Sequence, residues 1–187
     1  MVDDEIAAGR PPCGDFCSAS AGSALPCRHG GADDTLIGGA GNDSLAGGGD
    51  DDVLLGGEGL NTLLGETGDD QINGGGAADN LGGGLGDDTL NAGAGADVLS
   101  GGAGEDLIWG GTGADVFRFT ELSNGIAEGD MIVDYSAAEG DSLDLPDGIS
   151  SIAGGYLLND KLVVVLEGDS DTIELVGIDD IRDVIFV

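Results

Sequence analysis

Ten oxygen-bearing side chains recur every nine residues through the middle of this chain, and they are the residues most able to do chemistry. They comprise nine aspartates and one asparagine: Asp34, Asp43, Asp52, Asn61, Asp70, Asp79, Asp88, Asp97, Asp106 and Asp115. Carboxylate and amide oxygens are hard ligands, which suit oxygen-seeking divalent cations better than they suit zinc. Carboxylates held close together repel one another unless a cation lies between them. The column therefore predicts a series of divalent cation sites.

A large apolar residue follows each of these side chains two positions later. This second column reads Leu36, Leu45, Leu54, Leu63, Ile72, Leu81, Leu90, Leu99, Ile108 and Phe117. Both columns belong to a nine-residue unit of the form GGxGxDxLx, which repeats ten times from His29 to Arg118. One such unit cannot bury its own apolar side chain, so the units must stack on one another as a solenoid.

The spacing of the two columns predicts the local structure of each unit. The last three residues form a short strand with the middle side chain inward, and the six before it turn the chain, with glycine supplying positive φ. A half-turn in every unit gives two units per coil, so alternate units stack in parallel about 4.8 Å apart. Ten units then form about five coils, with the aspartates in two files. Calcium fits these files best, because it accepts six to eight oxygens, both carboxylate and carbonyl.

The ten units resemble the RTX calcium-binding repeats, and this resemblance implies an all-β fold, a right-handed parallel β-roll. It also implies that the sixth-position aspartates bind calcium through their side chains, while backbone carbonyls of the glycine turns complete the shell. The glycines assigned to these sites are Gly38, Gly47, Gly56, Gly65, Gly74, Gly83 and Gly101. The sequence departs from the family unit at His29, Ala32, Asp50, Leu60, Asn61 and Glu66. We therefore expect poorly filled calcium positions near Asn61 and in the first coil.

A second period, of eighteen residues, lies in the fifth position of the units. Alternate units carry Asp33, Asp51, Asp69, Asp87 and Glu105, whereas the others carry Asn42, Leu60, Ala78, Ala96 and Ala114. Two units per coil would place these two sets on separate faces. The doubly acidic file is either a solvated charged edge or a file with stronger calcium uptake.

The composition limits the function. The 187 residues include 37 acidic and five basic ones, and the net charge of −32 argues against nucleic acid or an anionic membrane as a partner. The 39 glycines and few aromatic residues are typical of a disordered chain, but the strict periodicity argues against disorder. Neither an HExxH nor a GxSxG motif is present, so we expect no catalytic residues, no organic cofactor and no enzyme.

The two ends differ from the repeats. Residues 1–28 are interpreted as a flexible leader or linker, residues 29–118 as the β-roll, and residues 119–187 as a C-terminal β cap of five or six antiparallel strands. Three interpretations are open for the cysteines, which are Cys13, Cys17 and Cys27. Two of the cysteines form a disulfide and one is a free thiol, or all three are reduced, or all three bind zinc together with His29. In the cap, which is similar to the C-terminal region of secreted RTX metalloproteases, four further acids form either a cation site or a structural cluster. They are Asp130, Asp134, Asp141 and Asp144.

No secretory signal opens the chain, and its last residues, Asp183 followed by Val184 to Val187, are similar to a type I secretion signal. A final strand of the cap is the alternative interpretation. The combined expectation is a calcium-binding module that a Gram-negative bacterium exports through an ABC transporter and that folds in the extracellular medium. The alternatives are a calcium-dependent polysaccharide-binding or surface-adhesion module, and the C-terminal part of a larger secreted hydrolase. The oligomeric state is left open.

Overall fold

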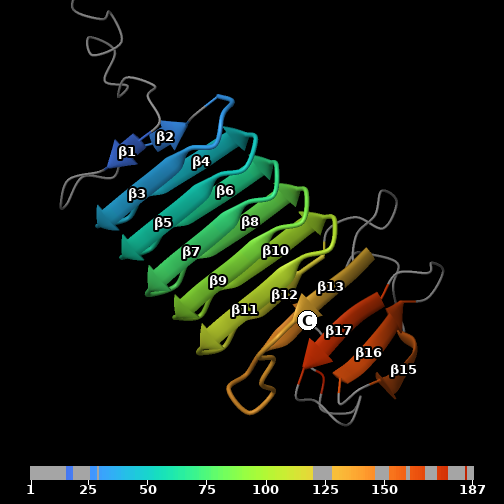
Figure 1. The fold of residues 1–187 in the computed structure, drawn as a ribbon. Helices are drawn as coiled ribbons and strands as arrows, with labels where there is room; N and C mark the ends of the chain where they lie inside the picture. The colour runs from blue at the N-terminus through green and yellow to red at the C-terminus, as the bar shows by residue number, and fades with distance from the viewer. Residues whose placement is uncertain are drawn as a thin grey trace, which may run out of the picture.

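The computed structural model describes residues 16–18, 26–28, 30–119, 128–145, 152–158, 161–166, 172–176 and 184. The regular elements in these ranges are strands in two sheets, and none of them is a helix (Figure 1). Accordingly, the described residues offer no apolar helix of sufficient length to cross a bilayer.

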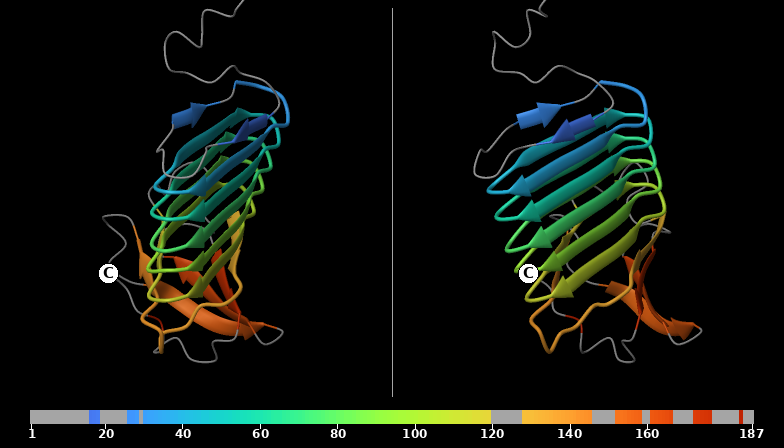
Figure 2. Two further views of the ribbon diagram at one scale, coloured as in Figure 1. Left: turned by 90° about the vertical axis from the view of Figure 1, so that its left-hand side faces the viewer. Right: turned by 60° about the vertical axis from the view of Figure 1, so that its left-hand side comes forward.

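The two sheets form two layers along one axis, as the side views show (Figure 2). In order across the first sheet lie β1 (Phe16–Ser18), β3 (Thr35–Ala40), β5 (Val53–Glu58), β7 (Gln71–Gly76), β9 (Thr89–Ala94), β11 (Leu107–Thr112), β13 (Glu128–Ile132), β17 (Thr172–Val176), β16 (Lys161–Leu166) and β15 (Ile152–Leu158). In order across the second lie β14 (Ser142–Asp144), β12 (Val116–Arg118), β10 (Val98–Ala103), β8 (Asn80–Leu85), β6 (Thr62–Thr67), β4 (Ser44–Gly49) and β2 (Pro26–Arg28). Successive strands of the repeat region alternate between the sheets, as a chain with two units per coil requires.

Alternate units stack in parallel and in register, as the period predicts. Leu36 of β3 lies opposite Leu54 of β5, and Leu45 of β4 lies opposite Leu63 of β6. The fold prediction of a parallel β-solenoid with about five coils is therefore confirmed. The pairing holds because each strand offers its neighbour the same pattern of side chains eighteen residues later.

The strands are twice as long as the sequence suggested. Each full strand joins the last three residues of one unit to the first three of the next, so only three residues remain for each turn. Gly39 of β3, for example, lies opposite Gly57 of β5. The expected three-residue strands were wrong because the N–H and C=O groups of the glycine pair also need partners, which the parallel neighbour supplies.

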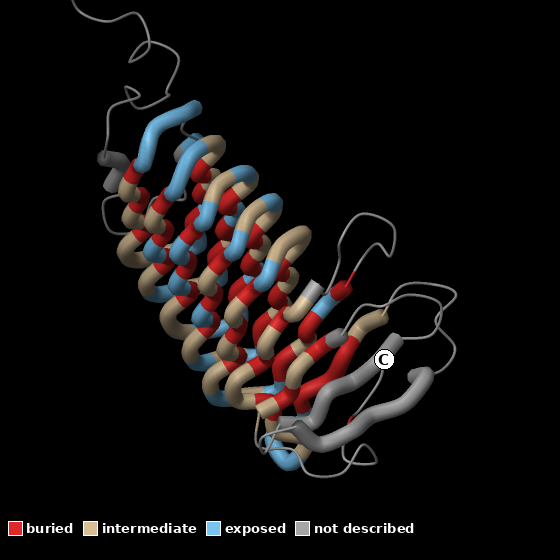
Figure 3. Tube along the Cα trace, turned by 45° about the vertical axis from the view of Figure 1, so that its right-hand side comes forward, coloured by how far each residue is buried: buried red, intermediate tan, exposed pale blue. Residues whose placement is uncertain are grey.

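The apolar column fills the narrow space between the sheets. All ten of its residues are at most 2% exposed. In Figure 3, segments coloured as buried recur from coil to coil along the roll. The column continues past the repeats, because Ile132 lies opposite Ile108 and Leu143 lies opposite Phe117. Both added side chains are fully buried.

The region after the repeats combines two kinds of pairing. β13 pairs in parallel with β11, and β14 pairs in parallel with β12, so both strands continue the roll. The prediction of antiparallel strands was wrong for these two, because the last repeats leave parallel edges that need partners. β15, β16 and β17 do pair antiparallel with one another. That they cap the roll remains a prediction.

Two short strands lie within residues 1–28, the segment interpreted as a leader. β1 pairs in parallel with β3, and β2 pairs in parallel with β4, so each adds one strand to the N-terminal end of a sheet. The thiol side chains and His29 lie outside the described residues. The zinc and disulfide alternatives, and the domain boundaries, remain predictions.

The unit imposes positive φ even where glycine is replaced. Ala32, Asp50 and Glu66 adopt φ values of 125°, 67° and 81°, as their glycine-like positions predict, and Ala77 adopts 76°. Such a residue stores about 1–2 kcal/mol of strain relative to glycine. Glu66 also forms an exposed ion pair with Arg28 at the end of β2, in which Nη2 of Arg28 donates to Oε2 of Glu66 at 2.9 Å.

Candidate metal centre

The sixth-position side chains form two buried ladders inside the roll, one at each file of turns. In the first file, the backbone N–H of each aspartate donates to Oδ1 of the aspartate one coil further along. The pairs are Asp34 to Asp52, Asp52 to Asp70, Asp70 to Asp88 and Asp88 to Asp106, all at 2.8 Å. The second file repeats this arrangement through Asp43 to Asn61 at 2.9 Å, Asn61 to Asp79 and Asp79 to Asp97 at 2.7 Å, and Asp97 to Asp115 at 2.9 Å. Every one of these residues is buried.

The ladders leave one oxygen of many carboxylates without a protein partner. In the described part of the protein this oxygen is Oδ2 of Asp70, Asp79, Asp88, Asp97, Asp106 and Asp115, and both oxygens of Asp43 are in this state. An unpartnered buried polar group costs about 1–3 kcal/mol, and a charged one costs more. A repeated row of such oxygens indicates that a cation, rather than a protein donor, belongs beside them.

The glycine that begins most of the units provides room for these carboxylates. A Cβ atom placed on Gly38 would lie 2.6 Å from the carbonyl oxygen of Gly56 and 2.7 Å from Oδ2 of Asp43. At Gly83 it would lie 2.5 Å from the carbonyl oxygen of Gly101 and would collide with the carboxylate of Asp88. A carboxylate oxygen and a backbone carbonyl oxygen therefore face the same small space, which is the mixture of donors that calcium accepts.

The other candidate glycines lie in the same kind of place. Gly47, Gly65, Gly74 and Gly101 adjoin Asp52, Asp70, Asp79 and Asp106, whereas Gly56 adjoins Asn61. All of the candidate glycines lie within strands, so their expected place in the turns was wrong. The three-residue turns instead begin at positions such as Gly41 and end at the ladder residue, here Asp43.

Burial raises the pKa of the ladder carboxyls. It brings the pKa of Asp88 to about 8 and those of Asp70 and Asp106 to about 6, although the ladder hydrogen bonds lower each pKa in part. The neighbouring carboxylates of the same file add to the rise at Asp70 and Asp88. The pKa values of Asp79, Asp97 and Asp115 are also raised, mainly by burial. Each of these groups therefore takes up a proton more readily in the folded chain unless a cation is bound.

Without a cation, the fold is expected to become more stable as the pH falls. A carboxyl group whose pKa is raised by folding contributes to the stability of the folded state. This stability is complete below the ordinary pKa of 3.8 and is lost as the pH rises through the folded-state values of about 6 to 8. With chelator present, circular dichroism should therefore report more β structure at pH 5 than at pH 8. In the presence of calcium the calcium midpoint should be higher at pH 5, because protons compete for the same oxygens. A chelated chain that gains β structure with rising pH would contradict this account.

Asn61 keeps the ladder but removes the anionic oxygen. Its Oδ1 accepts from the backbone N–H of Asp43 at 2.9 Å, as an aspartate would. Its Nδ2 donates to the carbonyl oxygen of Gly59 at 3.2 Å. The amide therefore supplies a hydrogen-bond donor where the neighbouring units supply a carboxylate oxygen, and this supports the expectation of a poorly filled position.

The fifth-position acids form a separate ladder at the surface. Asp69 donates its backbone N–H to Asp51, Asp87 donates to Asp69, and Glu105 donates to Asp87, each at 2.9 Å. These bonds run in the opposite direction to those of the buried ladder, and the acids are exposed. The eighteen-residue period therefore corresponds to a real outer ladder in one file, and both interpretations of it remain open.

The four acids beyond the repeats have three different roles. Asp130 and Asp141 extend the two buried ladders, because they accept the backbone N–H of Asp106 at 2.9 Å and of Asp115 at 3.0 Å. Sequence reasoning missed this because the spacing changes from 18 residues to 24 and 26. A signal was present, since each of the two is followed two positions later by an apolar residue, as in the repeats.

The other two acids, Asp134 and Asp144, accept hydrogen bonds from protein groups. Asp134 accepts the backbone N–H groups of Gly110 and Gly111, both at 2.9 Å. Asp144 pairs with Arg118 at 2.8 Å. Asp141 also accepts the N–H of Ser136 through Oδ2 at 2.8 Å, so both of its oxygens have protein partners. The second ladder thus ends at Asp141, each of whose two carboxylate oxygens accepts a backbone N–H.

The carboxylates are strung along the roll and are not gathered into compact clusters. Within the described ranges no group of three or more His, Cys, Asp and Glu side chains surrounds a common point. A shell of six to eight oxygens around calcium would therefore draw on backbone carbonyls and water as well as on the aspartates. The residues present fit calcium on this basis, since every donor is a hard oxygen.

Fold and site together define a class of protein, a parallel β-solenoid with buried files of carboxylates. Residues 30–63, 55–90 and 82–117 match the family model described as the RTX calcium-binding nonapeptide repeat, four copies. The chain therefore carries RTX calcium-binding repeats, and calcium is their cofactor. No curated protein sequence matches the chain.

Several solved structures are similar to this chain, and two of them illustrate the range. The AlgE6R3 subunit of the mannuronan C5-epimerase from Azotobacter vinelandii has 27% identity and a TM-score of 0.46, over 58% of this chain and 71% of that one. The extracellular lipase LipA from Serratia marcescens has 16% identity and a TM-score of 0.39, over 92% of this chain and 42% of that one. Both TM-scores lie below 0.5, so neither likeness decides the function.

Proposed function

We propose that this chain is a calcium-binding module whose β-roll folds when calcium enters the two ladders. The observation that carries the proposal is the row of buried Oδ2 atoms without a protein partner, of which Asp70, Asp88 and Asp106 are examples. In this account, metal binding free energy supplies folding free energy. The activity is binding, not catalysis.

The proposed ligands are those that the sequence indicated. The aspartates are Asp34, Asp43, Asp52, Asp70, Asp79, Asp88, Asp97, Asp106 and Asp115, and the glycine carbonyls beside them complete the shell. The proximity of the Gly56 carbonyl to the carboxylate of Asp43, across the Cβ position of Gly38, supports this assignment. Asn61 is the position that we propose to be weak.

Counting bound calcium ions tests the proposal. Native mass spectrometry at millimolar calcium should report several ions per chain, and Asn61→Asp should bind one more ion than the natural sequence. The added carboxylate keeps the ladder bond of Asn61 and replaces its amide donor with an anionic oxygen. Asn42→Asp, at the exposed fifth position of the same file, adds the same charge and should leave the count unchanged. No bound calcium would refute the function, and an unchanged count in Asn61→Asp would refute the ligand assignment.

We further propose that the chain is exported unfolded through a type I ABC transporter and folds outside the cell. Extracellular calcium-binding modules work at dissociation constants of about 10⁻⁴–10⁻³ M, which the calcium-poor cytoplasm does not reach. The formal charge of −32 favours an expanded chain in the absence of cations. Folding would then be delayed until the chain meets calcium.

Removal of Val184 to Val187 is expected to abolish export in a host that expresses a type I transporter, because these residues would form the recognised signal. The measurement is the amount of chain in the medium and in the cells. A loss of export could not be attributed to failed folding, because export precedes folding in this account. Undiminished export would contradict the signal and would favour the alternative interpretation, in which these residues form a final strand of the cap.

A further inference from the structure

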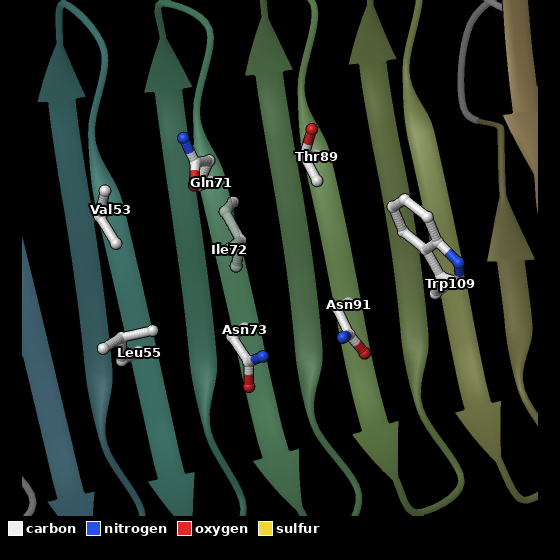
Figure 4. Close-up of a pocket in the computed structure, with 8 residues that line it drawn as sticks. All are labelled: Val53, Leu55, Gln71, Ile72, Asn73, Thr89, Asn91 and Trp109. Carbon is white, nitrogen blue, oxygen red and sulfur yellow. The ribbon is translucent and has the colours of Figure 1, made fainter.

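A shallow groove lies on the outer face of the first sheet, away from the two buried ladders. Its volume is about 330 Å³, and it crosses β5, β7, β9 and β11 (Figure 4). The lining residues are Val53, Leu55, Gln71, Ile72, Asn73, Thr89, Asn91 and Trp109. Because these four strands are stacked along the roll axis, a groove that crosses all of them runs along that axis.

The groove residues form two rows across the strands. In one row Leu55, Asn73, Asn91 and Trp109 lie opposite one another in turn, so an indole and a leucine flank two amides. In the other row Gln71 lies opposite Thr89. Because they occupy the seventh and ninth positions, these side chains point away from the core that the eighth position fills.

The polar groups of the groove are available to a ligand. In the part of the chain that the structure describes, no hydrogen bond joins the side chains of Gln71, Asn73, Thr89 or Asn91 to another protein group. Each amide carries both donors and an acceptor, which matches hydroxyl groups that donate and accept. Trp109 adds a flat apolar surface beside them.

The groove is also neutral in a strongly acidic molecule. None of its eight lining residues is charged, although the chain carries a formal charge of −32. An acidic ligand would meet no cationic side chain there, and a basic one would find better partners in the outer acidic ladder. The lining thus suits a ligand with many hydroxyl groups and no charge.

We propose that this groove binds a neutral oligosaccharide, with one sugar ring on Trp109 and sugar hydroxyls on Asn91, Asn73 and Gln71. The proposal goes beyond calcium binding, since none of these residues belongs to a ladder. It requires a folded roll and no particular number of bound ions. An extended peptide is the less favoured occupant, because peptides typically pair with the edge of a sheet and this groove lies on its face.

Trp109 is the only tryptophan of the chain, so its fluorescence reports directly on the groove. The calcium-loaded protein would be titrated with cellohexaose and maltohexaose as neutral probes, with a galacturonate hexamer as the acidic probe and with an unstructured neutral peptide. At least one neutral sugar should shift the tryptophan emission to shorter wavelength, with a dissociation constant of about 1 mM or below. The acidic sugar and the peptide should bind at least tenfold more weakly.

Variants test the contacts. Asn91→Leu keeps the fluorophore and should weaken neutral sugar binding about fivefold, through loss of hydrogen bonds. Trp109→Ala, followed by saturation-transfer NMR on the sugar, should abolish binding. Ser100→Leu, at the equivalent ninth position of β10 in the other sheet, is the matched control and should bind as the natural sequence does.

The outcomes separate this proposal from the calcium function. Circular dichroism establishes first that each sample folds with calcium, so a failure of calcium folding appears there and not in the sugar titration. In folded samples, absent binding of both neutral sugars would overturn the proposal. Tighter binding of the acidic sugar or the peptide, or an unchanged affinity in Asn91→Leu, would overturn it as well.

Discussion

Removal of calcium at pH 7.5 is expected to abolish most of the β structure of this chain. The ladder carboxyls whose folded-state pKa values lie near 6, those of Asp70 and Asp106, would then be ionised in a buried place without a counter-ion. The formal charge of −32 adds general repulsion in the compact state. Far-UV circular dichroism with chelator and with millimolar calcium measures the change.

Magnesium provides the control for this experiment. It demands near-octahedral geometry at short distances and gives up its water reluctantly, so it should not restore the β signal at the same concentration. Sodium chloride at equal ionic strength controls for simple screening. A β signal that is equal with chelator and with calcium would contradict calcium-dependent folding.

Substitution of Asp88 by asparagine is expected to have opposite effects with and without calcium. Asp88 lies in the middle of its file, is 1% exposed, and has a pKa raised to about 8 by burial. Asparagine keeps the oxygen that accepts the N–H of Asp70, as Asn61 does in the other file. The calcium midpoint of folding should rise about three- to tenfold, because an anionic ligand is lost. In chelator at pH 7.5 the folded state of the same variant should be more stable, because a buried aspartate must take up a proton or keep an uncompensated charge on folding, and asparagine needs neither.

Asp87→Asn is the matched control, since it removes the same charge one residue earlier. Asp87 is exposed and belongs to the outer ladder, where it accepts the N–H of Glu105. If the outer ladder is a solvated edge, this variant should shift the calcium midpoint less than twofold. A shift equal to that of Asp88→Asn would assign calcium uptake to the outer ladder as well. Equal small shifts in both variants would contradict the assignment of Asp88 as a ligand.

The nine-residue period was enough to predict the coil, the core and the two files of acids. A side chain such as Leu36 has a single place to be buried when its unit is too short to fold alone, so periodicity specifies both the stacking and the inward face. The same reasoning placed Asp34 and its equivalents in two files, because two units complete one coil. The prediction that Asn61 is a weak position rests on its residue type alone.

The length of the strands depended on pairing across the roll. The glycines at the start of each unit have the turn propensity that the sequence suggests, yet residues such as Gly39 lie in strands because the neighbouring coil offers them hydrogen bonds. The sequence also did not show that Gly38 leaves room for a carboxylate. Only the folded chain brings Oδ2 of Asp43 within 2.7 Å of the position that a Cβ atom on Gly38 would occupy.

The ends of the ladders were decided by tertiary structure alone. Sequence periodicity detects a partner at a fixed spacing, and Asp130 and Asp141 reach their partners over 24 and 26 residues. They are drawn into the ladders because the edges of β11 and β12 leave backbone groups and apolar side chains that β13 and β14 cover. The repeat thus determined what each coil contains, whereas the exposed edges of the last coil determined which later residues join it.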